Sequence, residues 1–263
     1  MNKRYIGALT LIPLLVFIFL GGYFLKITTL FLAARGLFEF YHVIIKKGHH
    51  PVKSLGYGAL LIYYVLLVFN EDPLRHLAVI IAMATTIGFV IMVFSERYSI
   101  TDISLTVMGF IYTGVMFGFL ILLEGLNGGI YLVYSVFVIS WVCDTMAYYT
   151  GRAFGKHKLI ERVSPKKTIE GAIGGLVGGA LGAFLLGYVV QSYTGIEPWK
   201  FLIMGFFGAM FGQIGDLAAS AIKRYAEEKD YPKLIPGHGG ILDRFDSILF
   251  VALFVYAYVM YLI

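Results

Sequence analysis

Charged residues are scarce in this chain. They make up 14% of its 263 residues, whereas about 25% is usual for a soluble protein. Hydrophobic residues reach 59%, against roughly 45–50% in soluble chains, so there is too little polar surface for a water-soluble fold. Cys143 is the single cysteine, which excludes an internal disulfide and a zinc site built from several thiolates. The composition predicts an integral membrane protein.

Long polar linkers are lacking too, and the apolar residues gather in segments close to the roughly 20 residues that span a bilayer. They predict an all-α, polytopic fold of about nine transmembrane helices in a single membrane domain, 1–263. Within it, 1–99 would be N-terminal scaffold helices and 100–263 the catalytic part. The expected spans are Tyr5–Leu25, Ile27–Ile45, Leu55–Phe69, Leu74–Phe94, Ile100–Leu122, Ile130–Thr150, Glu170–Val190, Trp199–Ile222 and Phe245–Ile263.

The basic residues fall on one side of this arrangement. Seventeen of the 21 lysines and arginines lie on the side of the N-terminus, three lie opposite, and Arg35 lies within a span. By the positive-inside rule the N-terminus is cytoplasmic, and nine spans put the C-terminus outside. Two loops hold most of this charge, 151–169 and 223–244, and both are predicted to be cytoplasmic.

The seventh expected span is rich in glycine. Its glycines form two series with four-residue spacing, at 171, 175 and 179 and at 174, 178 and 182. Such series let another helix backbone approach closely. They predict helix packing within the chain or, alternatively, a homodimer interface.

Four acids stand near one face of the predicted membrane domain: Asp144, Asp216, Asp243 and Asp246. Acids near membrane depth are costly and mark functional sites. Asp243 and Asp246 start a helix, where the alternative interpretation is capping of the free N–H groups. Asp216 lies towards the C-terminal end of its helix, where the helix dipole disfavours an anion. It therefore needs a cation partner, either a metal ion or a Lys or Arg side chain.

The first basic loop ends in Ser164, Lys166, Lys167 and Thr168, just before the glycine-rich helix. Cations, hydroxyls and free backbone N–H groups at a helix start suit a phosphate group. The spacing of Gly151 and Gly155 is not that of a Walker A loop. The alternative is that the lysines contact anionic lipid headgroups.

The second basic loop combines basic, acidic and glycine residues more densely. Carboxylate oxygens at this density suit Mg²⁺ together with substrate phosphates, and the combination is typical of phosphoryl or nucleotidyl transfer. His238, between two glycines, is interpreted as a phosphate or leaving-group contact. The candidate substrate-binding residues here are Ser220, Lys223, Arg224, Lys229, Asp230, His238 and Arg244.

The stretch from Ser220 to Asp246 resembles the signature of phosphatidate cytidylyltransferases, also called CDP-diacylglycerol synthases. Two upstream segments are similar to other recurrent blocks of that family: Asp144-x-x-Ala-Tyr-x-x-Gly151-Arg152-x-x-Gly155-Lys156 and Ser164-Pro-Lys-Lys-Thr-x-Glu-Gly171. The resemblance covers about Trp141–Asp246. The first four expected spans match only in hydrophobicity and carry no functional inference.

The resemblance implies a reaction in which CTP and phosphatidate give CDP-diacylglycerol and pyrophosphate, with Mg²⁺ required. Asp216 and Asp246 would be the leading metal ligands, with Asp144 and Asp243 as further ligands or their supports. Lys166, Lys167, Lys223, Arg224 and Arg244 would hold phosphates. The expected partners are CTP, phosphatidate in the cytoplasmic leaflet of the cell membrane and other membrane lipids, and no nucleic acid.

Two other functions use similar features. A CTP-dependent lipid-alcohol kinase would need a similar frame and similar acids. A transporter for an anionic solute would place ionisable groups near the bilayer midplane, yet only Arg35 and Glu39 lie within spans in the early half. Those two residues are four apart on one helical face, so they could simply pair with each other.

Overall fold

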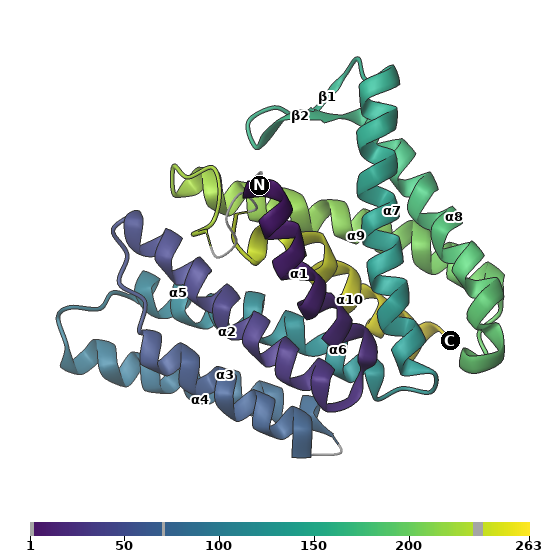
Figure 1. Cartoon of the computed structure of the whole chain (residues 1–263). Helices are drawn as coiled ribbons and strands as arrows, with labels where there is room; N and C mark the ends of the chain where they lie inside the picture. The colour runs from purple at the N-terminus through teal and green to yellow at the C-terminus, as the bar shows by residue number, and fades with distance from the viewer. Residues whose placement is uncertain (1–2, 70–71, 234–238) are drawn as a thin grey trace. The chain divides into compact units, whose positions relative to one another are not determined.

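The structure is a computed structural model that describes residues 3–69, 72–233 and 239–263. Within these residues the regular elements are helices and one two-stranded hairpin, joined by loops (Figure 1). The elements are α1 (Lys3–Leu20), α2 (Gly22–Lys46), α3 (Lys53–Phe69), α4 (Pro73–Phe94), α5 (Ile100–Gly109), η1 (Phe110–Val115), α6 (Met116–Glu124), α7 (Gly129–Phe154), β1 (Lys158–Ile160), β2 (Ser164–Thr168), α8 (Ile169–Thr194), α9 (Pro198–Tyr225) and α10 (Leu242–Leu262). The π-helical turn η1 joins α5 to α6, so 100–124 is one continuous helical stretch.

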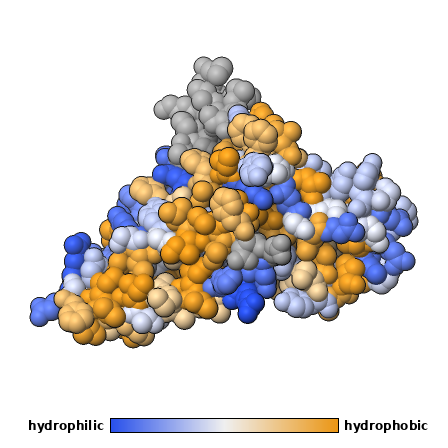
Figure 2. Space-filling view, turned by 90° about the horizontal axis from the view of Figure 1, so that it is seen from below, coloured by the Kyte–Doolittle hydropathy of each residue, from blue (hydrophilic) through white to orange (hydrophobic). Residues whose placement is uncertain are grey.

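Seven of the described helices are long and apolar enough to cross a membrane: α2, α4, the stretch 100–124, α7, α8, α9 and α10. Large apolar side chains are exposed along α4, among them Val79, Val90 and Phe94. Figure 2 shows hydrophobic residues over much of one face. Such surface is favourable in lipid and unfavourable in water. The predicted all-α, polytopic membrane fold is therefore confirmed, whereas the count of nine spans and the cytoplasmic N-terminus stay predictions.

The predicted spans agree with the helices to within a few residues, and the largest difference is at the first boundary. The chain breaks at Gly21, not after Leu25, so Lys26 lies within α2. Gly21 has φ 70°, a left-handed backbone conformation that glycine adopts without a steric penalty. Hydrophobicity continues through this break, and for that reason the apolar pattern placed it too late.

One compact unit comprises Met1–Ile121 and Tyr225–Arg244. Its core contains completely buried apolar side chains such as Leu37, Phe110 and Phe117. The segment 225–244 contains most of the second basic loop and belongs to the same unit as α2. The early helices therefore share a core with residues that the sequence associates with chemistry.

The other compact unit comprises Leu122–Arg224 and Phe245–Ile263. In it α7 and α8 lie side by side, and the antiparallel hairpin β1–β2 adjoins α8 (Figure 1). The hairpin was not predicted, because its two short strands lie in a polar loop without alternating hydrophobic residues. Thr168 ends the hairpin and begins the helix, since its side-chain oxygen accepts a hydrogen bond from the Gly171 N–H at 3.2 Å.

The glycines of α8 allow close packing within this unit. A Cβ atom placed on Gly179 would lie 2.7 Å from the Cβ of Ala209 on α9, and one on Gly178 would lie 2.5 Å from Met146 on α7. Both four-residue series therefore face neighbouring helices of the same chain, as the first of the two alternatives predicted.

Candidate active site

A cavity of about 390 Å³ lies within the second unit, at the end of α7 that adjoins the hairpin. The elements α7, β2, α8 and α9 supply most of its lining. The lining residues are Asp144, Ala147, Tyr148, Gly151, Arg152, Leu159, Lys166, Lys167, Thr168, Gly171, Ala172, Gln213 and Asp216. The cavity therefore brings together residues from the first basic loop and two of the four predicted acids.

Asp216 forms an ion pair with Lys167 across this cavity. The acid comes from α9 and the lysine from β2, and both side chains are partly exposed. One helical turn beyond Asp216, the hydroxyl of Ser220 donates to its Oδ1 atom at 3.5 Å. The prediction that Asp216 needs a cation partner is confirmed, and the partner is the side chain of Lys167.

Asp144 and Asp246 both lie close enough to Asp216 to interact with it electrostatically. Lys223 also lies close enough to Asp246 to interact with its carboxylate electrostatically. The backbone N–H of Ser247 donates to Asp246 Oδ1 at 2.8 Å, which fixes one oxygen of that carboxylate. Three carboxylates from α7, α9 and α10 therefore lie within electrostatic reach of one another, with the ammonium groups of Lys167 and Lys223 beside them.

The carboxylates of Asp144, Asp216 and Asp246 fit a magnesium ion by their chemistry. Mg²⁺ takes hard oxygen ligands and commonly uses one or two carboxylates, with substrate phosphates and water completing the shell. Among residues 3–69, 72–233 and 239–263, no three His, Cys, Asp or Glu side chains are placed to hold a metal by themselves. A site in this cavity would thus need oxygens from the substrate.

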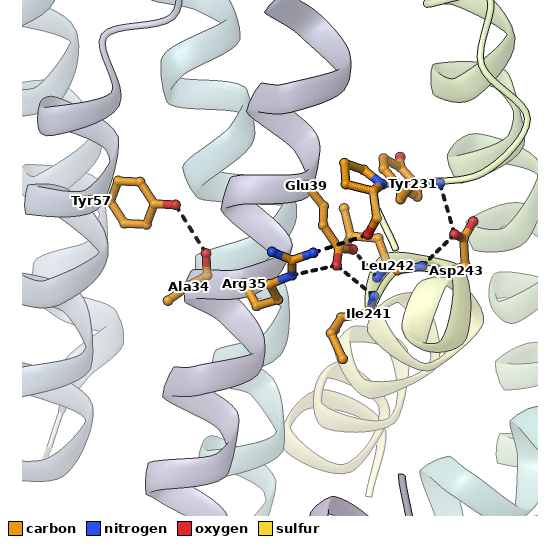
Figure 3. A network of polar contacts seen from close by, with 10 residues as sticks. Ala34, Arg35, Glu39, Tyr57, Tyr231, Ile241, Leu242 and Asp243 are labelled. Atoms are coloured by element: carbon orange, nitrogen blue, oxygen red, sulfur yellow. Dashed lines mark hydrogen bonds and ion pairs between the residues drawn. The ribbon is translucent and has the colours of Figure 1, made fainter. Parts of the chain in front are cut away.

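Asp243 has a different environment, in the first unit (Figure 3). Its Oδ2 atom accepts hydrogen bonds from the backbone N–H of Tyr231 at 2.9 Å and of Gly240 at 3.0 Å. The carboxylate thereby joins two separate points of the second basic loop, at residues 231 and 240. Both donors lie before the first residue of α10, so these contacts hold the loop and do not cap the free N–H groups of the helix, which was the alternative that the sequence offered.

The first basic loop differs from its prediction in one respect. The backbone N–H groups of Lys156 and His157 donate to the carboxylate of Glu170, at 3.1 and 3.3 Å. Glu170, in the first turn of α8, thereby holds these two residues; at the helix start itself, where free N–H groups were expected, the N–H of Gly171 is bound by the Thr168 side chain. Lys166, Lys167 and Thr168 do line the cavity, while Ser164 lies at the start of β2 and is not among the lining residues.

The remaining candidates of the second basic loop are divided between the units. Ser220, Lys223 and Arg224 end α9, in the unit of Asp216. Lys229 and Asp230 line a smaller hollow of about 250 Å³ in the first unit, and Arg244 is exposed in the first turn of α10. His238 lies outside the described residues.

Tyr148, Arg152 and Gln213 line the cavity although the sequence did not single them out for a role. Gln213 donates to the carbonyl oxygen of Ala172 at 2.9 Å, which links α9 to α8. Helical spacing could have found all three, because Tyr148 and Arg152 follow Asp144 by four and eight positions and Gln213 precedes Asp216 by three. Arg152 adds a cation to the lining.

Comparison with known proteins gives matches along the chain. A sequence model described as the cytidylyltransferase family matches residues 2–262. A phosphatidate cytidylyltransferase of Staphylococcus epidermidis is 34% identical over 253 residues, covering 92% of this chain and 93% of the relative. Another of Staphylococcus saprophyticus is 38% identical over 182 residues, covering 69% of this chain and 67% of the relative. The similarity therefore includes the N-terminal helices as well as the polar motifs.

Proposed function

The chain belongs to the cytidylyltransferase family, and we propose that it converts CTP and phosphatidate to CDP-diacylglycerol and pyrophosphate. It is a nucleotidyltransferase embedded in a membrane, which suits a substrate dissolved in lipid. The observation that supports a specific site is the cavity in which Lys166, Lys167 and Arg152 lie beside Asp144 and Asp216. Cations for phosphates and carboxylates for a metal are the groups that such a reaction requires.

The reaction needs two polyanions to meet. An oxygen of the phosphatidate phosphate forms a bond to the α-phosphorus of CTP, while the bond from that phosphorus to the oxygen bridging to the β-phosphate breaks. Pyrophosphate leaves with the electron pair. No side chain has to remove a proton, because the attacking phosphate is already ionised near neutral pH. The protein's task is therefore to position the two substrates and to offset their repulsion.

Lys167 is placed to couple phosphate binding to the state of Asp216. Its ammonium group pairs with that carboxylate. A phosphate bound by Lys167 competes for this ammonium group and releases the carboxylate of Asp216. Lys166 and Arg152, in the same lining, provide further contacts for phosphate oxygens.

Mg²⁺ is the proposed cofactor. Asp216 and Asp246 would hold it, with Asp144 as a further ligand or support, and it would supply neutralisation of the phosphate charge. Asp243 is proposed to support the site from the second basic loop. We place the site at the cytoplasmic face of the cell membrane, because CTP is a cytoplasmic solute and most of the basic residues lie in the two loops.

The direct test is an assay with purified protein in detergent, phosphatidate, Mg²⁺ and CTP labelled in the α-phosphate. We expect the label to move into a lipid product, CDP-diacylglycerol, and unlabelled pyrophosphate to appear. A second reaction with diacylglycerol and CTP labelled in the γ-phosphate tests the kinase alternative. Label in phosphatidate from the second reaction, with no lipid product from the first, would contradict the proposal.

A further inference from the structure

Glu39 is a buried carboxylate that the chemistry described above does not use. It lies in α2, one of the helices long and apolar enough to cross a membrane, and its exposed fraction is 0%. Its Oε1 atom accepts from Arg35 Nε and from the backbone N–H of Ile241, both at 2.9 Å. Its Oε2 atom accepts from the N–H of Leu242 at 2.9 Å. A charge without exposed surface is tolerated only with such partners, so these contacts specify its position.

The contacts of Glu39 complete the start of α10 (Figure 3). The first N–H groups of a helix lack partners within the helix, and a carboxylate placed there satisfies them and interacts favourably with the helix dipole. A residue next to the helix start usually does this. Here the acceptor comes from a residue 202 positions earlier in the chain than Ile241.

Arg35, one turn before Glu39 on α2, contacts the second basic loop at a different point, Pro232. Its guanidinium group donates to Glu39 and, through Nη2, to the carbonyl oxygen of Pro232 at 3.1 Å. One face of α2 therefore holds the backbone at Pro232 and at Ile241–Leu242. Asp243 joins the same two regions from within the loop, through Tyr231 and Gly240.

The sequence leaves room for this approach. A Cβ atom on Gly240 would lie 2.4 Å from Glu39 Oε2, so that position accepts only glycine without a shift of the acid or the loop. On α2, a Cβ atom on Gly36 would lie 3.2 Å from the Leu242 side chain. Glycines thus stand on both sides of the contact between α2 and the start of α10.

We propose that Glu39 and Arg35 are positioning residues for the nucleotidyl-transfer reaction. They fix the first turn of α10, and Asp246 follows about one turn further along that helix. Because α10 is one continuous helix, contacts that fix its first turn also fix the direction in which the Asp246 side chain projects from it. This inference rests on the proposed function, because it assigns Asp246 to the metal and substrate site.

The test uses Glu39→Gln in the full-length protein, with Thr29→Val as the matched control. Gln keeps the shape of the side chain but sets an amide N–H₂ against one of the donors that Glu39 binds. Thr29 is also buried on α2, where its hydroxyl donates to the carbonyl oxygen of Leu25 and its own carbonyl oxygen accepts from Tyr64 on α3. We expect Glu39→Gln to lower kcat by about tenfold to a hundredfold, as the loss of one charge-assisted hydrogen bond implies. It should also raise the Mg²⁺ concentration needed for half-maximal rate, while Thr29→Val changes neither.

Hydrogen–deuterium exchange provides a readout that is independent of activity. Peptides covering 239–246 should exchange faster in Glu39→Gln than in the wild type, and peptides from α8 should not. If the wild type makes no CDP-diacylglycerol, the proposed function fails, and the exchange still reports on the contact. Wild-type kcat and Mg²⁺ dependence in an active Glu39→Gln enzyme would overturn the positioning role, whatever the exchange shows.

Arg35→Lys covers the case in which Glu39→Gln aggregates. Lysine keeps the charge beside Glu39 but lacks the fork of donors that also binds Pro232. We expect a smaller fall in kcat with a monodisperse protein. Aggregation of both variants would show that the pair only stabilises the fold and would overturn the inference.

Discussion

Lys167 and Asp216 form an ion pair that joins the hairpin before α8 to the C-terminal half of α9. The first basic loop and the predicted acid therefore belong to one cavity, although 48 residues separate them in the sequence. A phosphate and a cation would each have to compete with this pair.

Replacing Asp216 or Asp246 by Asn should abolish turnover. Each change removes a negative charge from the carboxylate cluster and weakens cation binding, while the similar shape of Asn preserves packing. Glu197→Gln is the control, because Glu197 is an acid of the same unit that lies away from the cavity. The measurements are the rate of CDP-diacylglycerol formation and the size-exclusion profile. Wild-type rates in either Asn variant would exclude that acid as a ligand, and aggregation would assign it a structural role.

Replacing Lys167 by Gln should lower kcat/KM for CTP about tenfold to a hundredfold, because a charge-assisted hydrogen bond contributes roughly 1.5–3 kcal/mol. Lys53→Gln, outside the cavity at the start of α3, should have a small effect that depends on salt. Both variants should be assayed at two salt concentrations. Equal, salt-sensitive losses would mean that both lysines act only on lipid headgroups.

The orientation of the protein can be tested with reporters. A reporter that is active only outside the cytoplasm should give signal when fused to the C-terminus, and none when inserted next to Lys158. The reason is the one-sided distribution of the basic residues. The reverse pattern would place the two basic loops away from CTP and would contradict the proposed location of the site.

Replacing Gly179 by Ala should destabilise the protein by about 1–3 kcal/mol, the usual cost of overpacking. The new Cβ atom would lie 2.7 Å from the Ala209 Cβ, and neither is the end of a flexible side chain. Gly58→Ala is the matched control, since its Cβ position on the exposed side of α3 has no described atom within 4 Å apart from its chain neighbours and the nearby backbone of its own helix. Thermal unfolding in detergent should show a lower Tm only for Gly179→Ala. Equal Tm values would show that α8 and α9 separate without cost.

The sequence predicted most helices because long apolar segments report directly on burial in lipid. It also predicted that Asp216 has a cation partner, since the helix dipole makes an unpaired acid unfavourable there. The break at Gly21 was misplaced, because backbone conformation can change without a change in hydrophobicity. The hairpin was missed, because its strands carry no alternating pattern.

The role of Glu39 was harder to find in the sequence. Its spacing from Arg35 correctly indicated an ion pair within one helix. Its contacts with Ile241 and Leu242, however, use backbone N–H groups, which every non-proline residue has. No side chain at the far end marks the partner. Gly240 and Gly36 make room for the contact, but loops and helices contain glycine for many reasons, so neither glycine identifies the partner.

The contact between α2 and the start of α10 has a consequence for the chain during its synthesis, because α2 is made long before α10. Translation places α2 in the membrane long before residues 241 and 242 exist, so Glu39 first enters the bilayer with Arg35 as its neighbour of opposite charge. The emergence of α10 supplies the two missing hydrogen-bond donors. A nascent chain that stops after α9 keeps an incompletely satisfied acid in α2, and addition of the last helix removes that penalty.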